Sequence, residues 1–290
     1  MNEREFYQRV AGVFQPQKLK SKSAVVVGLG SGGCRVAAEL GRLGLRLVLV
    51  ERPGERLLEH NIVRHLLGYR SLGKSKLGEM AGYIKNLNPA ARVTPRALDV
   101  VEQHAQFVRL LEQTRPDLIA VCTDNETSKH RINEAALRLE IPQVGAGVYD
   151  GGVGGEVYVV RPGQACYGCI AAQIQPRRPA PPHRADPDYS RPDFAEARAT
   201  CALNLDIEQI ALLHARLALN LLLGGEPDLI GLPARVNLCV FANRVVAGTF
   251  ARPLHGEFFC VSQDPECLLC GRRRENVEAE AEQILASLGP

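Results

Sequence analysis

Residues 23–50 constrain the fold of this chain more than any other stretch. A β-branched apolar run at 24–27 leads directly into a cluster of glycines, and a helical pattern and a second apolar run at 48–50 follow without a gap. A short, continuously apolar run is typical of a strand buried on both faces. The order of these segments therefore predicts a strand, a tight turn, a helix and a second strand.

The glycine cluster predicts a nucleotide site at that turn. Gly28, Gly30 and Gly33 fit the spacing G-x-G-x-x-G, which allows a tight turn, a close approach of backbone to phosphate and a close helix–sheet contact. The N-terminus of the helix offers free N–H groups to an anion, and Glu51 ends the second strand where a carboxylate can bind a ribose hydroxyl. An NAD-dependent dehydrogenase has the same pattern, so these residues alone leave the nucleotide and the chemistry open.

Length and composition set the class of protein. With 290 residues and 46% hydrophobic content, the chain can bury the core of one large α/β domain with an appendage, or of two small domains. Its net charge of +3 comes from nearly balanced acids and bases, which favours neither nucleic acid nor a membrane surface as the main partner. No apolar run approaches the roughly 18 residues of a membrane span, and the N-terminal residues lack the apolar core of a signal peptide. We therefore expect a cytoplasmic protein.

Alternating strand and helix patterns fill the N-terminal half. Strands are predicted at 93–98, 117–122 and 142–148, and helices at 101–113 and 127–139. Repeated units of this kind predict a parallel sheet with helices on both faces.

From residue 151 the pattern changes to that of an antiparallel sheet. A glycine-rich turn leads into an alternating strand, and further antiparallel strands are predicted at 234–241 and 244–249. A long helix at about 205–223 has a wide apolar face suited to packing on the sheet. The fold class that follows is α/β: a Rossmann-like mixed sheet, parallel in its N-terminal half and antiparallel in its C-terminal extension, with helices on both faces.

The chain is expected to contain one main domain with an extension at each end. Residues 1–22 are predicted to form an N-terminal arm, a short helix followed by an extended lead-in, while 23–271 form the domain and 272–290 a C-terminal helix. A proline-rich run within 175–200 cannot sustain a helix or a central strand, and we expect a crossover loop there.

Four polar residues meet the demands of a site that cleaves ATP between its α- and β-phosphates. Cations must balance the charge on the α-phosphate and on the leaving pyrophosphate, and a carboxylate must hold Mg²⁺. Asp124 follows a predicted parallel strand, at the edge where open α/β sheets bind ligands. The full set is Asn61, Arg64, Lys76 and Asp124.

In their order along the chain, these motifs resemble those of the ThiF-type superfamily of ubiquitin-activating and sulfur-carrier-activating adenylyltransferases. Residues 28–33 resemble the family's ATP loop, 61–64 its N-x-x-R motif, 73–76 its G-x-x-K motif and 123–125 its aspartate turn. One departure is Glu51, where the family usually has Asp. The resemblance implies an ATP site formed by Gly28, Gly30, Gly32, Gly33, Glu51, Asn61, Arg64, Lys76, Asp124 and Asn125.

The resemblance, which covers residues 5–270, also implies a reaction and its partners. The C-terminal glycine of a small ubiquitin-like protein would be adenylated, with Arg64 and Lys76 stabilising charge and Asp124 holding Mg²⁺. Arg9, in a short Y-x-R segment, would reach the ATP site of the other subunit of a homodimer. The activated protein would pass to a downstream conjugating or acceptor protein.

Two pairs of cysteines predict a metal site. The chain has nine cysteines, and without a signal peptide, metal ligands, catalytic thiols or buried small residues are favoured over disulfides. Two C-x-x-C pairs, Cys166 with Cys169 and Cys267 with Cys270, can close a tetrahedral four-cysteine zinc site, which has no open position and is structural. Cys260 is the alternative ligand.

Cys201 is the candidate nucleophile. It stands just before the long helix, and a helix N-terminus favours the thiolate form of a nearby cysteine. In family members that form a thioester with a ubiquitin-like protein, the catalytic cysteine lies in a crossover loop before such a helix, so the resemblance assigns this role to Cys201. Cys34, also near a helix start, is expected to pack beneath the glycine loop, and His60 and His65 are expected on a helix surface.

Other functions remain as alternatives. Adenylation without a thioester would serve sulfur transfer, peptide modification or tRNA base dehydration, and activity that survives Cys201→Ala would favour it. A subunit that only binds a partner would lack ATP binding, and the intact set of Arg64, Lys76 and Asp124 speaks against it. A dehydrogenase offers no account of Arg64 and Lys76.

Overall fold

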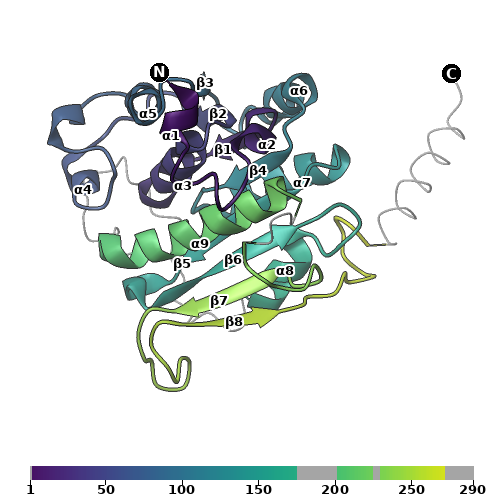
Figure 1. The fold of residues 1–290 in the computed structure, drawn as a ribbon. Helices are drawn as coiled ribbons and strands as arrows, with labels where there is room; N and C mark the ends of the chain where they lie inside the picture. The colour runs from purple at the N-terminus through teal and green to yellow at the C-terminus, as the bar shows by residue number, and fades with distance from the viewer. Residues whose placement is uncertain (1, 175–200, 225–228, 272–290) are drawn as a thin grey trace, which may run out of the picture.

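An eight-stranded mixed sheet forms the centre of the molecule (Figure 1). The structure, a computed structural model, describes residues 2–174, 201–224 and 229–271. The predicted crossover loop at 175–200 and the predicted C-terminal helix at 272–290 lie outside the described residues.

The sheet has a parallel and an antiparallel half, as the sequence predicts. Its strand order is β3-β2-β1-β4-β5-β6-β7-β8, with parallel pairs from β3 to β5 and antiparallel pairs from β5 to β8. β1 is central in the parallel half, and its Val25 pairs with Val48 of β2 and Ile119 of β4. The strands are β1 (Ser23–Val27), β2 (Arg46–Glu51), β3 (Arg92–Ala97), β4 (Leu118–Val121), β5 (Gln143–Val148), β6 (Gly154–Val160), β7 (Leu238–Ala242) and β8 (His255–Phe259).

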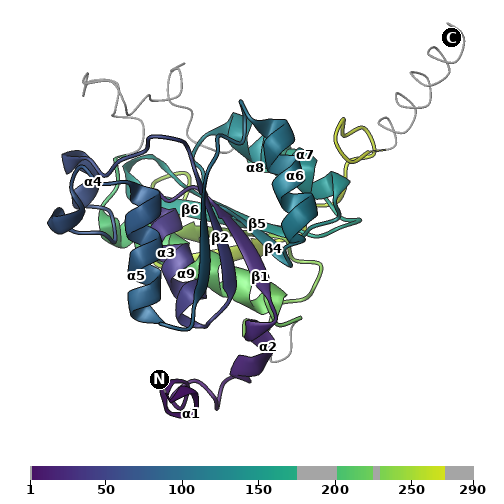
Figure 2. The same cartoon turned by 90° about the horizontal axis from the view of Figure 1, so that it is seen from above.

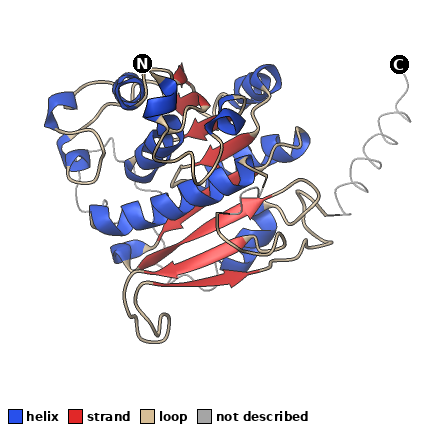
Figure 3. Cartoon of the chain, viewed as in Figure 1, coloured by secondary structure: helices blue, strands red, loops and turns tan. Residues whose placement is uncertain are grey.

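Helices cover both faces of the sheet, as Figure 3 shows in blue against the red strands. Seen from above, α3, α5 and α9 lie on one side of the strands and α6, α7 and α8 on the other (Figure 2). Within the described residues, none of the helices combines the length and the apolar character needed to cross a membrane. The helices are α1 (Glu3–Phe6), α2 (Pro16–Lys20), α3 (Ser31–Arg42), α4 (Glu59–Ile62), α5 (Lys76–Leu87), α6 (His104–Thr114), α7 (Glu126–Arg138), α8 (Tyr167–Ile174) and α9 (Asn204–Leu222), with short 3-10 turns at Tyr69–Ser71 and Asp150–Gly152.

Alternate strand residues pack into separate cores on the two faces. Val26 and Leu49 point into the core beneath α3, α5 and α9, whereas Val25 and Val50 point into the core beneath α6 and α7. All four are fully buried, and each such side chain contributes about 1.5–3 kcal/mol of hydrophobic free energy. This burial on both faces explains why β1 and β2 read as continuous apolar runs.

The last antiparallel strand differs from the prediction. Residues 244–249 form no strand; the third antiparallel strand is β8, further along the chain. Val246 and Phe250 instead form an isolated bridge, with backbone hydrogen bonds of 2.9 and 2.8 Å, around a turn in which Gly248 has φ +75°. The alternating pattern there is produced by a small hairpin rather than by a strand of the sheet.

The N-terminal arm packs onto the domain through apolar side chains. The predicted extended lead-in contains a second helix, α2, and Tyr7, Phe14 and Leu19 are buried. The hydroxyl of Tyr7 accepts a hydrogen bond from Nδ2 of Asn88 at 2.7 Å, at the C-terminal end of α5. These contacts fix the arm near the amino ends of the parallel strands (Figure 2).

Candidate active site

The glycine loop joins β1 to α3 at the carboxyl end of the parallel strands. Gly28 has φ +92°, and a Cβ there would lie 2.8 Å from the carbonyl oxygen of Cys122. A Cβ on Gly33 would lie 2.0 Å from the carbonyl oxygen of Gly28, so only glycine lets α3 begin this close to the strand. Gly30, the N-cap of α3, differs because its Cβ would meet no atom within 4 Å. The loop therefore opens at Gly30, and a helix N-terminus beside open space fits a phosphate group.

Glu51 anchors the glycine loop from the end of β2. Its carboxylate accepts hydrogen bonds from the backbone N–H of Leu29 at 2.7 Å and of Arg52 at 3.0 Å. Burial raises the pKa of Glu51, while these hydrogen bonds and the nearby charge of Lys76 act in the opposite direction. The acid that the sequence analysis assigns to a ribose thus also holds the loop, which the spacing of the motif does not reveal.

His65 supports the same loop, which corrects the prediction that it lies on a helix surface. Its buried ring places Nε2 2.8 Å from the carbonyl oxygen of Leu29, and Nδ1 accepts the backbone N–H of Leu67 at 3.0 Å. Because Nδ1 accepts, the proton lies on Nε2 and is donated to Leu29. Burial, aided by the charge of Lys76, lowers the pKa of His65 against the effect of the Leu29 hydrogen bond.

Lys76 is held near the loop by Glu55, a residue that no motif in the sequence marks. Its Nζ lies 2.7 Å from Oε2 of Glu55, and its backbone N–H donates to the Glu55 carbonyl at 3.2 Å. Burial raises the pKa of Glu55, but the hydrogen bonds and charges of Lys76 and Arg52 together outweigh burial and lower it. Since the charge of Lys76 also reaches Glu51 and His65, this ammonium lies in the neighbourhood of the glycine loop.

The segment around α4 brings the predicted cations together. Burial lowers the pKa of His60, and the charges of Arg64 and Lys76 lower it further, so both cations lie near this ring. Oδ1 of Asn61 accepts the backbone N–H of Leu58 at 3.0 Å and caps α4. Asn61 thus fixes the start of the segment that carries Arg64.

The aspartate turn lies beside the glycine loop. The backbone nitrogen of Thr123 is 3.2 Å from the Cβ position of Gly28, which places the end of β4 against the end of β1. Asn125 caps α7 by accepting the backbone N–H of Ser128 at 2.9 Å. Asp124, between them, is exposed, so its carboxylate is accessible to a cation at the edge of the site.

Arg9, which is predicted to reach the ATP site of another subunit, lies away from the glycine loop of its own chain. It is exposed and follows Tyr7, whose hydroxyl lies near Asn88 and near Gly44, just before β2 begins. This is the amino end of the parallel strands, whereas the glycine loop follows their carboxyl ends (Figure 2). A five-residue strand spans about 17 Å, which is longer than an arginine side chain. Arg9 therefore does not reach the glycine loop of its own chain.

Cys201 is exposed and precedes α9, whose beginning lies beside the beginning of α3. A Cβ on Gly32 would lie 3.9 Å from Ile207 of α9, and Glu208 forms an ion pair with Arg35 of α3. The chain that carries Cys201 thus enters α9 from the side of the glycine loop.

Cys34 is buried beneath the glycine loop, as predicted. Its Sγ donates to the carbonyl oxygen of Ser31 at 3.1 Å and accepts the backbone N–H of Leu66 at 3.4 Å. Burial raises the pKa of Cys34 to about 11 although the residue stands in the first turn of α3. Cys34 is therefore a protonated packing residue near neutral pH.

The cysteines of the two C-x-x-C pairs converge on one point. The sulfur atoms of Cys166 and Cys169 are 4.0 Å apart, those of Cys166 and Cys267 3.7 Å, and those of Cys169 and Cys270 3.5 Å. Zinc–sulfur bonds of about 2.3 Å in a tetrahedron separate the sulfurs by about 3.8 Å, so the cluster fits a zinc ion with four protein ligands. Cys260 is exposed and outside this cluster, so the alternative ligand is not needed.

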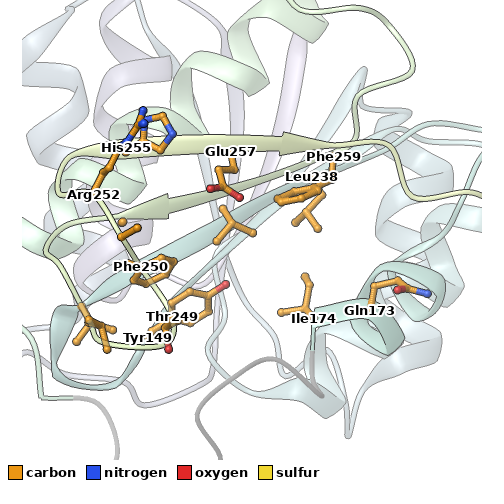
Figure 4. Close-up of a pocket in the computed structure, with 15 residues that line it drawn as sticks. Tyr149, Gln173, Ile174, Leu238, Thr249, Phe250, Arg252, His255, Glu257 and Phe259 are labelled. Atoms are coloured by element: carbon orange, nitrogen blue, oxygen red, sulfur yellow. The ribbon is translucent and has the colours of Figure 1, made fainter.

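A cavity of about 550 Å³ lies on the antiparallel half of the sheet (Figure 4). Leu238 and Phe259 line it from β7 and β8, and Ile174 at the end of α8 lies opposite them. The rings of Tyr149 and Phe250 stack 6.2 Å apart along one side. Tyr149 directly follows β5, so the cavity starts at the carboxyl edge that carries the glycine loop and the aspartate turn. Its lining also contains ionisable side chains: Arg252, His255 and Glu257.

The profile of the ThiF family matches residues 4–252 of the chain. Ubiquitin-like modifier-activating enzyme 5 of Aedes aegypti is similar, with 28% identity over 172 residues that make up 56% of this chain and 43% of that protein. The adenylyltransferase and sulfurtransferase uba4 of Aspergillus niger is 29% identical over 176 residues, or 57% of this chain and 35% of that protein. The chain thus spans less than half the length of these curated relatives.

Solved structures share the fold over most of the chain. E. coli MccB with AMPCPP and MccA superposes with a TM-score of 0.68 at 17% identity, covering 93% of this chain and 75% of that one. PaaA superposes with a TM-score of 0.65 at 14% identity, covering 89% and 83% of the two chains. At these identities the likeness shows the common fold.

Proposed function

Because the chain belongs to the ThiF family, we propose that it is an adenylating enzyme that uses ATP to activate the C-terminal glycine carboxylate of a small ubiquitin-like protein. The observation that carries this proposal is the meeting of the open glycine loop, the Glu51 carboxylate, the Lys76 ammonium and the aspartate turn at one edge of the sheet. An anion-binding loop with cations and a carboxylate around it meets the needs of ATP.

In the proposed reaction, a carboxylate oxygen of the substrate attacks the α-phosphorus in line. The bond from the α-phosphorus to the bridging oxygen of the β-phosphate breaks, and pyrophosphate leaves with the electron pair. Arg64 and Lys76 balance the charge that builds up on the phosphates, and Asp124 holds Mg²⁺. Glu51 binds the ribose. Preorganised charges of this kind act strongly because they need no rearrangement as the transition state forms.

Glu55 gives Lys76 a defined position before and during this step. Its carboxylate, 2.7 Å from Nζ, holds the ammonium without removing its charge. An ammonium has three N–H donors, so the contact with Glu55 leaves donors for phosphate oxygens. Lys76 can therefore bind phosphate while it keeps the contact with Glu55.

Cys201 is proposed to accept the activated carboxyl group. Its sulfur attacks the acyl carbon of the mixed anhydride, AMP leaves, and a thioester remains that a downstream conjugating or acceptor protein consumes. The exposure of Cys201, and the position of the start of α9 beside α3, support this role.

A homodimer is proposed from the position of Arg9. Arg9 lies at the amino end of the strands, away from the glycine loop of its own chain, which supports a role for Arg9 in the ATP site of a second copy. Co-expression of an Arg9→Ala chain with a Lys76→Ala chain tests this, because mixed dimers would contain one intact site.

The cluster of four cysteines is proposed to hold Zn²⁺ in a structural role. Four thiolates would leave the ion without an open position, so zinc would supply no catalytic chemistry and would join α8 to the segment after β8. A cytoplasmic location agrees with these reduced thiols and with the use of ATP.

The cavity in Figure 4 is proposed to receive apolar side chains of the substrate's C-terminal segment. It begins at Tyr149, on the edge where the α-phosphate would be bound, and runs along β7 and β8. A tail that ends at the nucleotide can thus place upstream side chains against Leu238 and Phe259.

Adenylation without a thioester is the second candidate. It is favoured by the similarity to uba4 of Aspergillus niger, whose name joins adenylyltransferase and sulfurtransferase. Its substrates would be sulfur-carrier proteins, peptides or tRNA. Detection of ATP binding would exclude the other alternative, an inactive subunit that only binds a partner.

The test is an ATP-dependent adduct assay with candidate proteins that end in glycine and are encoded next to this gene. Intact mass is recorded with and without thiol reductant, for the wild type and for Cys201→Ala. The proposal predicts an adduct that reductant removes and that the variant lacks. AMP formation with no thiol-linked species would remove the thioester step, and no ATP consumption with any candidate would contradict adenylation.

A further inference from the structure

Tyr167 links the four-cysteine cluster to the helix that follows the aspartate turn. It stands between Cys166 and Cys169 of this cluster, and its side chain is buried. Its hydroxyl donates to Oε2 of Glu126 at 2.5 Å, and its backbone N–H donates to Oδ1 of Asn133 at 2.9 Å. One tyrosine therefore binds α7 at two points, seven residues apart.

The contacts follow one face of α7. Besides the two hydrogen bonds, the ring of Tyr167 lies 5.2 Å from that of His130, and Nζ of Lys129 lies 5.8 Å from its centroid. The contacted positions are spaced i, i+3, i+4 and i+7, which is the spacing of one helix face over two turns. Tyr167 thus fixes both the rotation and the position of α7.

Glu126 is bound from two sides. In addition to the tyrosine hydroxyl, it accepts a hydrogen bond from Nζ of Lys129 at 3.1 Å, and the Lys129 side chain is only 3% exposed. A buried ammonium requires such a partner, and hydrogen bonds to ionised groups are stronger than neutral ones. The carboxylate of Glu126 therefore has a single defined position.

Glu126 is the first residue of α7 and follows Asn125 directly. Asn125 is the N-cap, and Asp124 precedes it. A shift in the first turn of α7 would carry Asp124 with it, because two peptide units separate Asp124 from Glu126. The backbone N–H of Tyr167 adds a second restraint through Asn133, whose Oδ1 also accepts Nε2 of Gln143 on β5 at 2.8 Å.

We propose that Tyr167 is a positioning residue that transmits the geometry of the four-cysteine centre, through Glu126, to the aspartate turn. A zinc ion bound by the four cysteines would fix the turn between Cys166 and Cys169 that carries Tyr167, and the phenol of Tyr167 holds the first turn of α7 through Glu126. This inference rests on the proposed function only where it assigns Asp124 to Mg²⁺. The mechanical link itself is independent of that assignment.

The test compares Tyr167→Phe with Tyr158→Phe. Both rings are buried and lie 4.7 Å apart, but within the described residues the hydroxyl of Tyr158 has no hydrogen-bond partner. Three quantities are measured: zinc content, hydrogen exchange of the amides at 124–129, and the Mg²⁺ concentration for half-maximal ATP-dependent adenylation.

Tyr167→Phe is expected to keep its zinc, to exchange faster at 124–129 and to need about three- to tenfold more Mg²⁺, since it loses one charge-assisted hydrogen bond. Tyr158→Phe is expected to match the wild type in all three. Combining Tyr167→Phe with Glu126→Ala should add little to the effect of Glu126→Ala alone, because both remove the same hydrogen bond.

Equal exchange and an equal Mg²⁺ requirement in the two tyrosine variants would overturn the inference and leave the proposed function intact. If the wild type adenylates nothing, the proposed function fails, and hydrogen exchange still decides the link. In that case, the link predicts faster exchange at 124–129 both in Tyr167→Phe and in wild type stripped of zinc by a chelator. Unchanged exchange would overturn the link.

Discussion

Replacing Gly30 by alanine adds one methyl group at the mouth of the glycine loop. The backbone of Gly30 has φ −68° and ψ −164°, an extended conformation that alanine adopts freely. The new methyl carbon would have no protein atom within 4 Å. The stability of the fold should therefore stay the same or rise by about 0.4–1 kcal/mol, the usual gain where alanine fits a glycine site.

Gly33→Ala is the matched control, since its added methyl group would clash with neighbouring protein atoms. Its methyl carbon would lie 2.0 Å from the carbonyl oxygen of Gly28 and 2.9 Å from Cβ of Cys122. The backbone atom cannot turn away, so α3 must shift. Such overpacking costs about 1–3 kcal/mol or more.

Both variants are measured by chemical denaturation and by calorimetric titration with ATP. Gly30→Ala should keep its folding free energy and lose at least about tenfold in ATP affinity, or about 1.4 kcal/mol, because the methyl group occupies space that a phosphate would take. Gly33→Ala should lose both stability and ATP binding. An unchanged ATP affinity in a stable Gly30→Ala variant would refute the assignment of the loop to phosphate.

Three further outcomes are expected. Burial lowers the pKa of His214 to about 4, so the imidazole takes up a proton at higher pH in the unfolded chain than in the folded one. The unfolding free energy of the wild type should therefore fall by up to about 3 kcal/mol relative to that of His214→Leu as pH falls from 6.5 to 4. Chemical denaturation across that range measures the difference in unfolding free energy between the two proteins. A difference that stays constant with pH would contradict the prediction. Treatment with a chelator should release one zinc ion per chain, measured with a metal indicator, and should lower the unfolding free energy by several kcal/mol. Purified protein that contains no zinc, and whose unfolding free energy the chelator does not change, would contradict the assignment of the four cysteines to zinc. Ala242→Trp, which fills part of the cavity lined by Leu238 and Phe259, should raise the KM for a polypeptide substrate about fivefold or more, because contacts worth about 1 kcal/mol are lost. The affinity for ATP should stay unchanged and serves as the control. A KM equal to that of the wild type would exclude the cavity as a substrate site.

Features encoded locally were predictable from the sequence. The glycine spacing fixes a turn because Gly28 and Gly33 face backbone oxygens closer than a side chain allows. The apolar runs of β1 and β2 are buried on both faces, which is why they lack alternation. The two C-x-x-C pairs have too little local freedom to place their sulfurs far apart, and their meeting across the chain is what a metal site requires.

Features that depend on distant partners were not predictable. Glu55 pairs with Lys76 only because the loop after β2 lies along the start of α5. His65 is buried because Leu29 offers a carbonyl oxygen to it, and nothing in the neighbouring sequence marks that contact. Residues 244–249 have the alternating pattern of a strand, yet Val246 pairs with nearby Phe250 in a small hairpin rather than with a strand of the sheet.

The most direct test of the central claim is pyrophosphate exchange into ATP, measured with purified protein and candidate polypeptides that end in glycine. Adenylation predicts that labelled pyrophosphate enters ATP only when such a polypeptide is present, and that Asp124→Ala and Lys76→Ala abolish the exchange. Turnover of ATP to ADP and phosphate, with no exchange for any candidate, would contradict the account.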